Sequence, residues 1–135
     1  MTRFIPVHAL IAATLVLGTL APSAGFADEK ASISAELQAA MQRHIARSSI
    51  EGAILDLDTE TGEMRRLYPT KAHPMIMVGE GYFVLCADLL TEDGQSFEVD
   101  YFVAQTDRGF QIFRTEIDNR AVLHGLRAAG QVRAF

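Results

Sequence analysis

After residue 48 the hydrophobic pattern of the chain changes its period from the 3.6 of a helix to the 2 of a strand, and this change most limits the possible folds. Between residues 33 and 48 apolar positions recur three and four apart, and polar residues fill the other face. Ser32 or Ser34 can cap this helix, after a polar leader at 28–32. From residue 53 apolar and polar residues alternate. The pattern predicts an α+β domain in which a helix covers a sheet.

Turn sequences divide the remainder of the chain into strands. Asp93-Gly94 and the run from Thr106 to Gly109 supply turn chemistry between alternating segments. Because consecutive strands joined by short turns pair antiparallel, we expect a curved antiparallel sheet of about five strands, a hairpin and then a three-stranded meander. The expected strands are 53–58, 63–68, 82–90, 97–104 and 110–117, and the apolar run that forms 82–90 begins near Met75 and pauses at 79–81.

A short carboxy-terminal helix is expected after the last strand. Asp118 or Asn119 can cap its start, and Gly130 ends it. Its apolar side is formed by Val122, Leu123 and Leu126. The order of elements resembles that of small cystatin-like and NTF2-like domains, in which a helix packs on a curved sheet. The resemblance is one of architecture and implies no functional residue.

The amino terminus has the three parts of a secretory signal peptide. Arg3 supplies a positive charge, an apolar stretch spans residues 4–20, and Gly25-Phe26-Ala27 places small residues at positions −3 and −1 of a cleavage site. The uninterrupted apolar core is about 13 residues, shorter than the about 20 that a membrane span needs. The sequence therefore predicts residues 1–27 as a signal peptide and 28–135 as a single exported domain, periplasmic in a Gram-negative bacterium and otherwise secreted, with no membrane attachment after cleavage.

The charge of the chain argues against some classes of partner, and its cysteine content excludes an internal disulfide. The chain has 17 acidic and 12 basic residues, and cleavage of the signal peptide removes only Arg3 among them. Arg65-Arg66 is the one adjacent basic pair in the sequence, which argues against nucleic acid and anionic membranes as partners. Cys86 is the only cysteine, so no internal disulfide can form.

The segment 82–90 is apolar on both faces. Phe83, Leu85, Ala87 and Leu89 form one face, and Tyr82, Val84 and Cys86 make the other face apolar as well. Such a pattern is typical of a central strand that is covered on both sides. Either the segment 69–81 and the closing helix, with Phe135, cover the outer face, or a partner does. The simplest such partner is a second copy of the chain, in a homodimer whose two subunits contact each other through a patch around Phe102.

The segment His73-Pro74-Met75-Ile76-Met77 is the most specific candidate for a binding site. In an extended strand His73, Met75 and Met77 project from one face. An imidazole with two thioethers suits Cu(I), and Cys86 can add a thiolate if its strand lies alongside. The alternative is that both methionines fill the core and that His73 lies in an exposed loop.

Other chemistry-bearing residues have simpler interpretations. Cys86 is expected to be buried and inert rather than nucleophilic. The acidic run 56–63 superficially resembles a calcium loop, but its glycine stands at the seventh position instead of the sixth, and a hairpin turn explains it better. His44 is expected in the helix-facing core. Candidates for acid–base chemistry are Asp88, Glu98, Asp100, Glu116 and His124, with a solvated acidic face as the alternative.

These observations favour a small exported protein that is not an enzyme. No catalytic motif is present, and no cofactor or catalytic residue is assigned. We expect a binding or accessory module that acts through its sheet on a protein or small ligand. The alternatives are a Cu(I)-binding protein that uses His73, Met75 and Met77, and a small cone-shaped enzyme whose site forms only in three dimensions.

Overall fold

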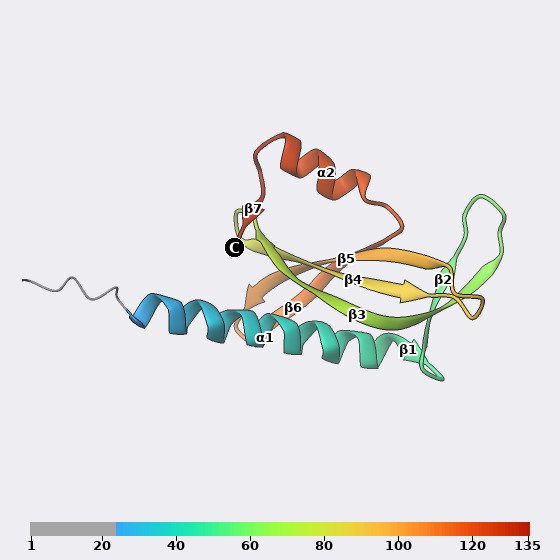
Figure 1. The fold of residues 1–135 in the computed structure, drawn as a ribbon, viewed down its shortest axis with the longest axis horizontal. Coiled ribbons are helices and arrows are strands. Elements are labelled where there is room, and N and C mark those ends of the chain that lie inside the picture. Colours follow the sequence, from blue (N-terminus) through green and yellow to red (C-terminus); the bar gives the residue numbers. More distant parts are fainter. Residues whose placement is uncertain (1–23) are drawn as a thin grey trace, which may run out of the picture.

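A computed structural model describes residues 24–135, which form one sheet with a helix on each side (Figure 1). Most of the predicted signal peptide lies outside the described residues. Within the described range, neither helix is long and apolar enough to cross a membrane. The elements are α1 (Ala24–Ser48), β1 (Ser49–Ile50), β2 (Ala53–Leu57), β3 (Met64–Val78), β4 (Tyr82–Leu90), β5 (Ser96–Thr106), β6 (Gly109–Ile117), α2 (Ala121–Ala128) and β7 (Arg133–Ala134).

The strands form one antiparallel sheet in the order β1-β2-β3-β4-β5-β6, and β7 pairs with β3. Each strand from β1 to β5 pairs with the next along the chain, as expected for strands joined by short turns. The predicted α+β fold, with an amino-terminal helix on a curved antiparallel sheet and a short carboxy-terminal helix, is confirmed. The two-residue strands β1 and β7 have no recognisable pattern in the sequence.

Helix α1 is longer than its apolar pattern predicts. It begins at Ala24 rather than near residue 33, so the expected polar leader at 28–32 is helical. Residues 26–31 contain neither glycine nor proline, so nothing in this stretch breaks the helix. Ser34 lies inside the helix, where its hydroxyl donates to the Lys30 carbonyl, and the predicted serine caps are therefore wrong. The first turn, at 24–27, spans the predicted cleavage site.

The main core lies between α1 and the sheet. The helix contributes Leu37, Ala40, Met41 and Ile45, whose three- and four-residue spacing places them on one face. They meet sheet residues that include Leu67, Leu85, Leu89, Val99, Tyr101 and Val103, all inaccessible to solvent. His44 lies beside this core with its ring edge-on to Tyr101, and burial, aided by the nearby Arg47, lowers its pKa.

Strand β3 runs without a break from Met64 to Val78, although Pro69 and Pro74 lie within it. The predicted strand 63–68 and the separate segment 69–81 are therefore largely one element, and the expectation that 69–81 covers the outer face is wrong. Proline has no amide hydrogen to donate, so it is tolerated only where the ladder is interrupted or open. The pairing with β4 shifts register between Pro69 and Ala72 and again before Ile76.

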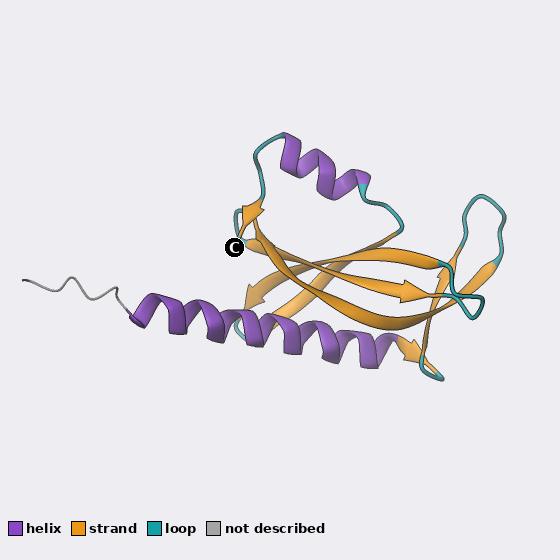
Figure 2. Ribbon diagram, in the orientation of Figure 1, coloured by secondary structure: helices purple, strands orange, loops and turns teal. Residues whose placement is uncertain are grey.

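Helix α2 covers the outer face of the sheet, opposite α1 (Figure 2). Leu123 is buried against Met77, Val84, Cys86 and Phe102, and Val122 and Leu126 pack at the edges. The apolar outer face of 82–90 is therefore covered by the chain itself. Pairing with a second copy stays a prediction, which light scattering of the full chain tests.

Two details of this outer layer differ from the sequence-based expectation. Phe135 packs with the helix-side core against Phe83, not on the outer face. The residue that caps α2 is Arg120, with no side-chain cap from Asp118 or Asn119. Asp118 instead adopts a φ of 55°, which turns the chain out of β6. Gly130 ends the helical segment as expected, with a φ of 68° that a side chain would disfavour.

Candidate functional site

The outer face of β4 and β5 carries a polar cluster beside α2. The antiparallel register places Cys86 opposite Asp100 and Asp88 opposite Glu98. The sequence correctly placed Asp88, Glu98 and Asp100 on one face. The alternative of a uniformly solvated acidic face is wrong for Asp100, which is 1% exposed.

An ion pair between Asp100 and Arg120 anchors the amino-terminal end of α2 to the sheet. The Arg120 Nη1 lies 2.7 Å from the Asp100 Oδ1, and Nε lies 3.5 Å from the Glu98 Oε2. The Oδ2 of Asp100 and the Nε of Arg120 are buried without hydrogen-bond partners in the described part of the chain. Burial raises the pKa of Asp100 although Arg120 opposes the shift. Burying this ion pair under α2 costs solvation free energy, because both charged groups lose contact with water.

Cys86 is buried in this layer, as its apolar neighbours predict. Burial and the adjacent Asp100 carboxylate raise the pKa of the thiol to about 12. A thiol that stays protonated at neutral pH is a poor nucleophile. The prediction that Cys86 is buried is therefore confirmed, and its surroundings do not activate it.

The predicted ligands His73, Met75 and Met77 line one cavity, of about 330 Å³, between α2 and the outer face. Cys86 reaches the same cavity from the neighbouring strand. Met75 is 60% exposed, whereas Met77 is 5% exposed and belongs to the outer core. The other lining residues are Pro74, Arg120, Leu123 and Arg127. The alternative of an exposed histidine in a loop is wrong, since His73 lies within β3 and contacts Asp88.

The remaining acid–base candidates lie outside this cavity. Glu116 faces Asp100 across β5 and β6 but accepts hydrogen bonds from Arg114 and Asn119. His124 is exposed on α2. Arg120 and Arg127 were not predicted as site residues, because the closing helix was expected only as an apolar cover. A basic residue at each end of that short helix was the available signal.

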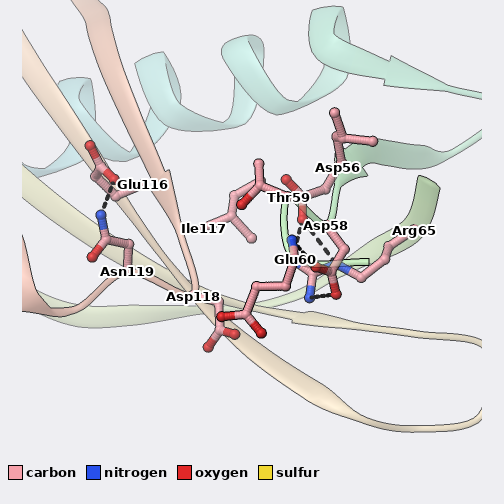
Figure 3. A pocket seen from close by; sticks show the side chains of 10 residues that line it. Asp56, Asp58, Thr59, Glu60, Arg65, Glu116, Ile117, Asp118 and Asn119 are labelled. Carbon is pink, nitrogen blue, oxygen red and sulfur yellow. Dashed lines mark hydrogen bonds and ion pairs between the residues drawn. The ribbon is translucent and has the colours of Figure 1, made fainter. Parts of the chain in front are cut away.

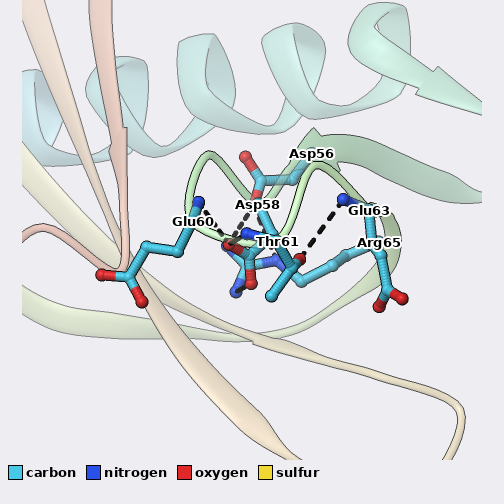
Figure 4. A network of polar contacts seen from close by, with 6 residues as sticks. All are labelled: Asp56, Asp58, Glu60, Thr61, Glu63 and Arg65. Atoms are coloured by element: carbon cyan, nitrogen blue, oxygen red, sulfur yellow. Dashed lines mark hydrogen bonds and ion pairs between the residues drawn. The ribbon is translucent and has the colours of Figure 1, made fainter.

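A larger cavity, of about 590 Å³, lies between the β2–β3 turn and the end of β6 (Figure 3). Its lining includes five carboxylates, those of Asp56, Asp58, Glu60, Glu116 and Asp118. The carboxylates of Asp56 and Asp58, which lie nearest the turn, are engaged in hydrogen bonds and ion pairs within it (Figure 4).

Asp58 organises that turn. Its Oδ1 accepts hydrogen bonds from the amides of Glu60 and Thr61 at 2.9 and 3.2 Å, which lower its pKa. Arg65 pairs with Asp56 and lies 3.8 Å from Asp58. The acidic run is thus a hairpin turn, as expected, and its contacts account for the carboxylates of Asp56 and Asp58 without a ligand.

Comparisons of the chain with protein-family models, curated proteins and solved structures gave no match. The cystatin-like or NTF2-like resemblance therefore stays a prediction. The cavity under α2 is the better candidate site, because it combines an apolar floor with several polar groups.

Proposed function

We propose that this chain is a non-enzymatic binding module whose ligand occupies the cavity between α2 and the outer face of the sheet. One observation carries the proposal: His73, Met75, Met77, Leu123 and two arginines converge on one opening of about 330 Å³. That volume falls at the lower end of the range for small-ligand sites.

The lining defines the ligand class. Met77 and Leu123 form an apolar floor, and the exposed thioether of Met75 can adapt to a ligand that covers it. His73, Arg120 and Arg127 supply hydrogen-bond donors at the margin. We therefore infer a small molecule with an apolar body and at least one hydrogen-bond acceptor.

Cys86 and the Asp100–Arg120 pair are better suited to binding than to catalysis. Cys86 stays protonated at neutral pH, and the charges of Asp100 and Arg120 compensate each other. A nucleophile or general base needs a free group with a pKa near the working pH. Neither Cys86 nor the Asp100–Arg120 pair supplies such a group.

We place this module outside the cytoplasm, in keeping with the predicted signal peptide. Cleavage after Ala27 removes only the first turn of α1, where Phe26 is 75% exposed. The core contacts of α1 begin at Ile33 and Leu37, so they remain intact after cleavage.

Replacing Met75 with lysine is expected to weaken the binding of an uncharged apolar fluorescent probe, such as Nile red, by about tenfold. A charged head in the cavity must lose water when the probe binds. Met64, on the same strand and 64% exposed, lines neither this cavity nor the core. Met64→Lys is therefore the matched control and should bind the probe as the unchanged protein does. Equal binding by both variants would contradict the assignment.

Cu(I) binding is the second candidate, favoured by the convergence of His73, Met75, Met77 and Cys86 on this cavity. Thioether and imidazole donors suit Cu(I) better than harder ions. The protonated Cys86 must lose its proton to join such a site.

A Met75→Leu, Met77→Leu double variant is expected to lose Cu(I) uptake in a titration under reducing conditions. Leucine keeps the volume of methionine at small cost in packing. Met64→Leu serves as the control and should retain full uptake. If the double variant binds as much Cu(I) as the control, or if the unchanged protein binds none, the two methionines are packing residues only.

A further inference from the structure

The geometry points to a second kind of site at the edge of this cavity, a divalent transition-metal site formed by His73, Asp88 and Glu98. One ligand atom from each of the three side chains lies within 4.8 Å of the other two. The residues come from three adjacent strands, β3, β4 and β5. The site shares only His73 with the cavity and does not depend on what the cavity binds.

The present spacing is close to that of a metal site. The Nε2 of His73 lies 3.0 Å from the Oδ1 of Asp88, and two donors on one tetrahedral zinc ion lie about 3.3 Å apart. Only the Glu98 carboxylate must move closer. Its side chain is 47% exposed, so it can adopt another rotamer.

The strand framework holds two of the donors in place. Asp88 and Glu98 are directly opposed in the β4–β5 register, and the Thr70 hydroxyl donates to the backbone carbonyl of Asp88 at 3.0 Å. The register shift in β3 before Ile76 sets where His73 lies relative to β4. A site on strands retains its geometry better than a site on a mobile loop.

Charge around the three residues favours a cation. Directly opposed like charges destabilise a sheet, and Asp88 and Glu98 are such a pair. Asp100 adds a third carboxylate two residues along the same face, 1% exposed and with an unpartnered Oδ2. Among residues 24–135, Arg120 is the arginine that pairs with these carboxylates, through Asp100 and Glu98. A divalent ion would compensate the excess negative charge.

The donor set selects the class of ion. One imidazole and two carboxylates suit Zn²⁺ and neighbouring transition metals, whereas Mg²⁺ and Ca²⁺ prefer oxygen donors alone. Three protein ligands leave further coordination positions to water, as in open zinc sites. Met75 and Met77 are not needed for this ion, which separates the site from the Cu(I) candidate.

Calorimetric titration of the full chain with Zn²⁺ tests this proposal. One ion per chain is expected, with weaker binding of Mn²⁺ and no measurable binding of Mg²⁺. Glu98→Gln and His73→Ala should each lower the Zn²⁺ affinity at least tenfold, because the first replaces a charged ligand with a neutral amide and the second removes the imidazole donor. Glu98→Gln keeps the size and exposed position of the side chain, so it is the variant least expected to disturb folding.

Two controls make the outcome specific. Glu116→Gln removes a carboxylate on the same face that is not a proposed ligand, and it should bind Zn²⁺ as the unchanged protein does. The Met75→Leu, Met77→Leu variant should also retain Zn²⁺ binding. The proposal is overturned if the chain binds no Zn²⁺ at millimolar concentration, or if Glu98→Gln and Glu116→Gln lower the affinity equally.

Discussion

Replacing Arg120 with alanine is expected to lower the free energy of unfolding by about 3 kcal/mol. The change leaves the carboxylate of Asp100, 1% exposed, without its ion-pair partner. Breaking a buried pair from one side is costly because the remaining charge cannot be solvated. Urea unfolding in buffer containing a chelator measures the effect without interference from bound metal.

The loss should depend on pH in a defined direction. Burial already raises the pKa of Asp100 in the folded protein. The contribution of Asp100 to the free energy of unfolding therefore falls as the pH rises above the pKa that this carboxyl has in the unfolded chain. Removing Arg120 raises the pKa of Asp100 further, and protonation then relieves the penalty. We therefore expect a smaller loss at about pH 5 than at about pH 7.5.

Arg114→Ala is the matched control for this prediction. Arg114 pairs with Glu116 on the same face, but its side chain is 53% exposed, and exposed pairs contribute at most about 1 kcal/mol. If Arg114→Ala and Arg120→Ala lower the free energy of unfolding equally, the buried charge of Asp100 does not need Arg120 to compensate it.

Replacing Leu123 with alanine is expected to lower the free energy of unfolding by about 3 kcal/mol. Leu123 is 2% exposed and is the side chain by which α2 fills the outer core. The substitution removes buried apolar surface and leaves a cavity beside Val84 and Phe102. Urea unfolding measures the loss, and an apolar dye should bind more strongly to the altered face.

Leu126→Ala provides the comparison on the same helix. Leu126 is only partly buried at the edge of the outer core, so its replacement should cost less than half as much. A loss below about 1 kcal/mol for Leu123→Ala would mean that α2 does not pack on the sheet as described.

Much of the fold was predictable from the sequence, because helices, strands and turns each leave a pattern in a short stretch of residues. The spacing of Leu37, Met41 and Ile45 marks the face of α1, and the two-sided pattern of 82–90 correctly indicates a strand covered on both faces. The Asp93-Gly94 turn is also in place, with Gly94 at a φ of 87°. Turn chemistry and periodicity need no knowledge of distant contacts.

The errors arose where distant contacts decide the outcome. The strand predicted at 63–68 was expected to end before Pro69, but pairing with β4 through shifted registers carries β3 across Pro69 and Pro74. The amino-terminal extension of α1 has no apolar face that could have revealed it. Phe135 was assigned to the wrong layer because the pairing of β7 with β3, which fixes its position, spans more than 50 residues.

The candidate site was predicted in pieces. The alternation of β5 placed Glu98 and Asp100 on one face, and His73, Met75 and Met77 were correctly grouped on one side of their strand. The burial of Asp100 depends on Arg120, which lies 20 residues further along the chain. The contact between His73 and Asp88 depends on the irregular β3–β4 register, which no local pattern encodes.

Nuclear magnetic resonance can show whether a small ligand binds in the cavity under α2. The full chain, labelled with nitrogen-15, would be titrated with small apolar acceptor-bearing molecules. We expect the changes in amide shift to concentrate at His73, at Met75 to Met77, at Cys86 and along 120–127, around the cavity under α2. Changes concentrated instead at 56–60 and 116–119, around the larger acidic cavity, would contradict it.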